Sequence, residues 1–105
     1  MEQPNLNYIK ELAAGDVTFE QKLIQIVKTE LPDEIATYEL NISNNAFAKA
    51  AENVHKLKHK LGIVGLVEGY DLAISFEEEL KLGKNDLKEQ FDIVLLSVVH
   101  FINDL

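Results

Sequence analysis

Apolar residues recur at spacings of three and four along most of the chain, and this pattern predicts amphipathic helices. Strict alternation of apolar and polar residues, which would indicate strands, is almost absent. Proline occurs only at Pro4 and Pro32, so few positions interrupt a helix. We therefore predict an all-α fold.

The first two predicted helices are separated by a glycine. A short helix over residues 6–13 ends before Gly15, which suits a C-terminal cap. Either Asp16 or Thr18 caps the second helix, and Thr18 with Gln21 matches a capping box. The apolar stripe of this helix consists of Phe19, Leu23, Ile26, Val27, Leu31, Ile35, Tyr38 and Leu40.

Two features are expected to interrupt the second helix and then to end it. Pro32 lacks a backbone N–H and should kink or restart the helix. Residues 41–45, rich in Asn and Ser, read as a turn with several N-cap candidates.

Three further helices complete the prediction. They cover residues 46–63, residues 66–82 and a segment that begins after Asn85 or Asp86. Connections of a few residues favour antiparallel neighbours. We predict one domain over residues 1–105, an antiparallel up-down four-helix bundle with a short additional N-terminal helix. Its core is expected to include the five phenylalanines, Phe19, Phe47, Phe76, Phe91 and Phe101.

The amino-acid composition argues against several classes of function. Eighteen acidic against ten basic residues give a net charge of −8, which repels a nucleic-acid backbone. The absence of cysteine excludes disulfides, thiolate metal sites and cysteine nucleophiles. We find neither a secretory signal nor an apolar run long enough to span a membrane. A cytoplasmic monomer that binds neither nucleic acid nor membrane is expected.

The third predicted helix contains a basic cluster that departs from this acidic background. Its three lysines, Lys56, Lys58 and Lys60, stand at every second position and lie next to two histidines, His55 and His59. On a helical wheel, His55 lies roughly 130° from the centre of the apolar face, so its ring should be exposed. The residues expected beside it are mostly small, which would leave room for another protein to dock; they are Ala48, Ala51, His59, Gly62 and Leu66.

The run His55-Lys56-Leu57-Lys58, followed by Gly62 and Gly65-Leu66, resembles the motif of the histidine-containing phosphotransfer (HPt) domain family. Upstream, Leu6-Asn7-Tyr8-Ile9, Gly15-Asp16 and Phe19 are similar to the usual opening of that family. The resemblance covers the chain from about Leu6 to the final helix.

This resemblance implies a phosphorelay intermediate without kinase activity of its own. His55 would accept a phosphoryl group on Nε2 from a receiver-domain aspartate and pass it to another receiver domain. Lys58 would contact a phosphoryl oxygen. The partners would be response-regulator receiver domains and a sensor histidine kinase. No cofactor is expected on this chain, since the Mg²⁺ ion would sit on the receiver.

Two more positions follow from the resemblance. Glu77 stands where family members often carry a glutamine or glutamate that orients the imidazole. His59 is a departure, because the family usually has glycine directly after the lysine. This second imidazole could crowd the docking partner, donate to the phosphoryl group or act as a second acceptor.

Other interpretations of the residues around His55 are also compatible with the sequence. The same fold could dock a receiver without being phosphorylated, or His55 and His59 could form half of a metal site. A surface histidine without a function is the least specific reading. Lys56 and Lys60 are expected only to lend positive potential, and the run Glu77-Glu78-Glu79 to be mainly a solvated helix face.

Overall fold

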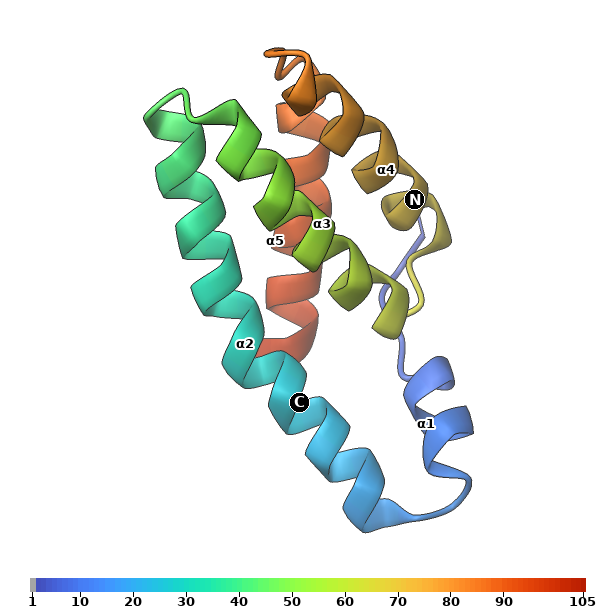
Figure 1. Cartoon of the computed structure of the whole chain (residues 1–105). Helices are drawn as coiled ribbons and strands as arrows, with labels where there is room; N and C mark the ends of the chain where they lie inside the picture. The colour runs from blue at the N-terminus through green and yellow to red at the C-terminus, as the bar shows by residue number, and fades with distance from the viewer. Residues whose placement is uncertain (1) are drawn as a thin grey trace.

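The computed structural model describes residues 2–105 and confirms the all-α prediction (Figure 1). Its helices are α1 (Asn7–Ala13), α2 (Val17–Ser43), α3 (Phe47–Ile63), α4 (Val67–Lys81) and α5 (Lys88–Asn103). Helices α2 to α5 run alternately up and down and form the four-helix bundle. The short α1 lies outside it, beside the N-terminal half of α2.

The bundle encloses a core to which α2, α3, α4 and α5 all contribute. At its centre the rings of Tyr38, Phe76 and Phe91 pack edge-on or tilted, with centroids 5.1–6.2 Å apart. The buried Tyr38 hydroxyl donates a 2.8 Å hydrogen bond to Asp92. Burial and this carboxylate raise the pKa of Tyr38, so the phenol stays protonated and its polar atom is satisfied inside the core.

Helix α2 is longer than predicted. Pro32 does not restart the helix, which continues from Val17 to Ser43. Buried residues on both sides of the proline, Leu31 and Tyr38, pack into the bundle and hold the two halves in one helix. The predicted turn is also shorter, because the helix includes Ser43 and only Asn45 takes a left-handed φ of 54°.

The N-cap of α2 and the set of its buried apolar residues also differ from the prediction. Asp16 is the N-cap, since its side chain accepts from the backbone N–H of Phe19, and Thr18 already lies inside the helix. Ile24 is buried in place of Ile26, and Phe19 is exposed, as is Leu40 near the other end of the helix. The first turns of α2 extend past the bundle beside α1, so their other face has no helix to cover it (Figure 1).

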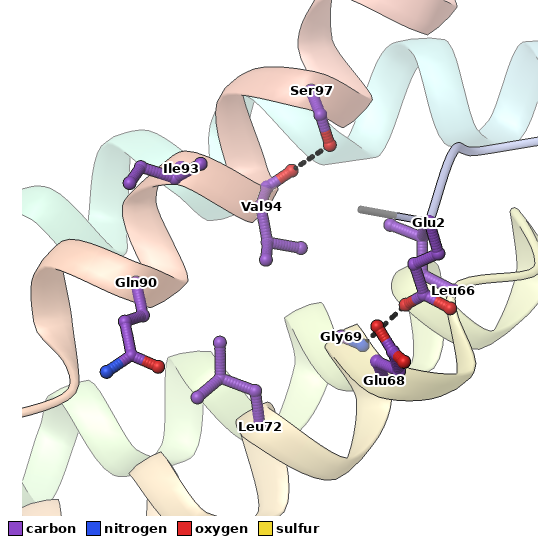
Figure 2. Close-up of a pocket in the computed structure, with 9 residues that line it drawn as sticks. All are labelled: Glu2, Leu66, Glu68, Gly69, Leu72, Gln90, Ile93, Val94 and Ser97. Carbon is purple, nitrogen blue, oxygen red and sulfur yellow. Dashed lines mark hydrogen bonds between the residues drawn. The ribbon is translucent and has the colours of Figure 1, made fainter.

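The N-terminal segment braces the turn between α3 and α4. Helix α4 has no side-chain cap of its own, and Glu2 supplies one by accepting a 2.7 Å hydrogen bond from the Gly69 N–H (Figure 2). The Asn5 N–H donates to the Val64 carbonyl at 2.8 Å. Gly65 has a φ of +79°, and a Cβ there would lie 2.7 Å from the Asn5 side chain. The segment therefore fixes where α4 begins relative to α3.

Lys60 is buried between α3 and α2, contrary to the expectation that it lends surface potential. Its Nζ lies 3.0 Å from Glu30 and 2.9 Å from Glu34. Burial lowers the pKa of Lys60, but the hydrogen bonds that Lys60 donates to Glu34 and Glu30 outweigh it and hold that pKa above its usual value. The charge of Lys60 is therefore used to join two helices.

Replacing Lys60 by methionine should lower the free energy of unfolding by about 2 kcal/mol, because two adjacent carboxylates lose their shared cation. Urea denaturation at pH 7 measures this loss as a lower midpoint. Lys56→Met removes the same charge from an exposed position on the same helix and should change stability by less than about 0.5 kcal/mol. Equal losses in both variants would contradict the role of the ion pairs.

Candidate functional site

His55 lies in the middle of α3, on the flank of the helix rather than toward the core. Its neighbours Val54 and Leu57 are fully buried and orient this part of the helix. The His55 side chain is 52% exposed. The imidazole therefore stands at the surface, as the helical wheel predicts.

Glu77 of α4 reaches across to His55. Its carboxylate oxygens lie 3.1 and 3.2 Å from Nδ1 of the ring. A carboxylate can only accept, so Nδ1 carries the proton and donates to Glu77. In the neutral ring this leaves the lone pair on Nε2, to which no other described residue makes a hydrogen bond. The free nitrogen is the one that a partner can approach.

Lys58 joins the same carboxylate. Its Nζ lies 3.3 Å from Glu77 Oε1 and 3.3 Å from His55 Nδ1. The lysine and the Nδ1–H are both donors, so the shared acceptor between them is Glu77. The Lys58 side chain is only 12% exposed, and its ammonium lies 5.8 Å from the centroid of the Tyr70 ring. The structure thus brings together all three residues selected from the sequence for the chemistry.

A fourth residue, Lys81, was missed by the sequence analysis. Its Nζ lies 3.3 Å from Glu77 Oε2, and its side chain is 54% exposed. The available signal was its position four residues after Glu77, the favourable order for an ion pair on a helix. Partial burial raises the pKa of Glu77, but hydrogen bonds from His55, Lys58 and Lys81 outweigh it and lower that pKa overall. Glu77 is therefore ionised at neutral pH.

The five residues predicted for docking do not form one exposed strip. Ala48 and His59 are exposed and Gly62 is half-buried, whereas Ala51 and Leu66 are buried. Ala51 belongs to the core cluster. Leu66 comes after α3 has ended at Ile63, so the wheel of α3 does not apply to it. Exposure was therefore wrongly expected at Ala51 and Leu66.

The two sides of His55 along α3 differ in their surroundings. Toward the start of α3 lies a shallow hollow, lined by Ala48, Ala51, Glu52, Asn53, His55, Lys56, Glu77 and Lys81. In the other direction the His59 ring packs edge-on against His55, with centroids 5.1 Å apart. Beyond it, a Cβ on Gly62 would lie 3.4 Å from the Tyr70 ring. The hollow therefore reaches His55 directly, whereas an approach from the other side meets the His59 ring first.

Among residues 2–105, no group of three or more His, Asp or Glu side chains is placed to hold a metal ion. No helix in the same range combines the length and apolar character needed to cross a membrane.

The arrangement defines a class of protein, a helical bundle that presents an oriented histidine for group transfer. A family model described as the Hpt domain matches residues 22–99. The chain therefore belongs to the Hpt domain family, whose members carry out histidine phosphotransfer in two-component phosphorelays and interact with receiver domains and kinases. Neither the curated proteins nor the solved structures contain a significant match.

The lowered pKa of Glu77 makes part of the stability pH-dependent. A carboxylate whose pKa is depressed by folding stabilises the fold above its unfolded pKa, about 4.3, and this contribution is lost as pH falls through the folded value. The difference in unfolding free energy between wild type and Glu77→Gln should shrink as pH falls below about 4.3.

Urea denaturation at a series of pH values measures that difference. Glu78→Gln is the matched control, because Glu78 is exposed and lies 3.8 Å from Lys81. A difference for Glu77→Gln that stays the same from pH 7 to pH 3 would show that the carboxylate charge contributes nothing.

Proposed function

We propose that this chain is a phosphorelay intermediate that accepts a phosphoryl group from a receiver-domain aspartate on His55 and passes it to another receiver domain. The observation that carries this proposal is the exposed His55 ring, whose Nδ1 is held by Glu77 and whose Nε2 is free. Family membership supports the type of reaction, and the free Nε2 supports the choice of atom.

This chain contributes to the transfer mainly by holding the His55 ring in position. The Nε2 lone pair attacks phosphorus and forms the N–P bond, while the bond from phosphorus to the aspartate oxygen breaks and its electron pair leaves with the carboxylate. The ring keeps its Nδ1 proton and becomes positively charged. Glu77 stabilises that charge through the 3.1 Å contact. In the reverse direction the charged ring is a good leaving group, which suits a carrier.

Lys58 is the lysine of α3 that contacts the His55 ring. It is one turn from His55 and already within 3.3 Å of the ring. A rotation of its flexible side chain would place the ammonium beside a phosphoryl oxygen as a point charge. We expect the Mg²⁺ ion of the receiver to neutralise the other oxygens, so this chain needs no cofactor of its own.

Receiver domains and a sensor kinase are the proposed partners. The receiver would dock over Ala48, the hollow and the exposed edge of His59, with Gly62 at the margin of the contact. We propose that the chain acts as a cytoplasmic monomer.

Phosphoryl transfer can be tested with a phosphorylated receiver domain as donor. Wild-type protein should acquire an acid-labile, alkali-stable label, and His55→Gln should acquire none while its circular dichroism stays helical. His59→Gln is the matched control and should retain the label. A receiver that binds without transferring label would indicate an adaptor, and label lost only in His59→Gln would move the acceptor by one turn.

Lys58→Gln should slow transfer to His55 by about tenfold to a hundredfold, because the transition state loses one positioned cation. Rapid-quench measurement of the label on His55 gives the rate. Lys56→Gln removes a neighbouring exposed charge and should change that rate less than threefold. Equal effects of the two substitutions would indicate that Lys58 contributes only to the general positive potential of this surface.

A further inference from the structure

The hollow beside His55 contains a cation that the resemblance to the family does not assign. Lys81, at the C-terminal end of α4, lines this hollow together with His55 and Glu77. We propose that Lys81 is a positioning residue that keeps Glu77 neutralised when Lys58 turns to the phosphoryl group. This inference rests on the proposed function of His55.

The two lysines occupy opposite ends of one carboxylate. Lys58 lies against Oε1 and Lys81 against Oε2, both at 3.3 Å. They differ in environment, since Lys58 is 12% exposed and Lys81 is 54% exposed. When Lys58 moves away from Oε1, Glu77 therefore still has the cation of Lys81 at Oε2.

Phosphorylation creates the need for such an arrangement. A phosphoryl group brings a charge of about −2 to Nε2, on the same small ring that Glu77 contacts through Nδ1. With Lys58 drawn to the phosphoryl oxygens, a Glu77 without Lys81 would have only the charged ring as a cation, and that ring also carries the phosphoryl dianion. Lys81 at Oε2 keeps the carboxylate neutralised, so Glu77 continues to accept from Nδ1–H and the ring keeps its orientation.

The charges around the ring agree with this role. The charged and titratable residues that line the hollow or contact the ring are Lys56, Lys58, His59 and Glu52 from α3, and Glu77 and Lys81 from α4. With both histidines neutral, three lysines and two glutamates give this group a net charge of +1. Removal of Lys81 leaves the group without net positive charge, before a phosphoryl group arrives on a chain whose net charge is already −8. Lys81 therefore supplies the net positive charge of the group.

The experiment measures the equilibrium between a phosphorylated receiver domain and this chain, with label quantified on both proteins. Lys81→Gln should shift the equilibrium toward the receiver by about threefold to tenfold, as expected for a lost charge a few ångströms away through partly exposed side chains. Lys81→Arg should restore the wild-type value. Lys84→Gln, just beyond the end of α4, removes the same formal charge and should change the equilibrium less than twofold.

A second measurement separates positioning from general charge. In ¹³C NMR titrations of the unphosphorylated proteins, the Glu77 carboxyl should titrate at a higher pH in Lys81→Gln than in wild type or Lys84→Gln, because the ion pair at Oε2 lowers its pKa.

The inference is overturned if Lys81→Gln and Lys84→Gln give the same equilibrium, or if the Glu77 titration is unchanged in Lys81→Gln. The first of these outcomes requires that wild-type His55 takes label. A wild-type protein that takes no label would overturn the proposed function instead, whereas the Glu77 titration would still report on the ion pair with Lys81.

Discussion

The Glu77 carboxylate is the interaction on which the site depends. It accepts from His55, Lys58 and Lys81 at distances of 3.1 to 3.3 Å, and it joins α3 to α4 at the surface of the bundle. Because a carboxylate cannot donate, it determines which ring nitrogen carries the proton. A flexible surface histidine thereby becomes an oriented group with one free nitrogen.

The same residue type serves two purposes within one turn of α3. Lys60 points toward α2 and is buried between Glu30 and Glu34, where it joins two helices. Lys58 points toward α4 and lies beside the reactive ring. A difference of two positions rotates a side chain by about 200° around the helix, so adjacent lysines face different partners. Charge alone therefore does not identify the functional lysine.

The distance between His55 and Glu77 depends on how α3 and α4 are joined. The N-terminal segment contributes to this joint, because Asn5 bonds to the Val64 carbonyl and Glu2 caps the first turn of α4. Gly65 allows the backbone to turn where a Cβ would meet Asn5. Residues far from the ring in sequence thus hold the two helices that form the site.

Periodicity was sufficient to predict much of the fold. The spacing of apolar residues predicted each helix to within a few residues, and the wheel placed His55 on an exposed flank. The wheel failed at Ala51 and Leu66, because it describes one straight helix and contains no information about the neighbours that cover it. It failed at Phe19 for the opposite reason, since no helix covers that face of α2.

The sequence by itself determined the helices, the exposed histidine and, through family resemblance, the pairing of His55 with Lys58 and Glu77. Only the tertiary structure decided that Lys81 shares Glu77, that Lys60 is buried and that the surface is open on the Ala48 side of the ring. Local spacing controls which face of a helix a residue occupies. The packing of α2 and α4 against α3 controls what that face meets, and those contacts join residues far apart in the chain.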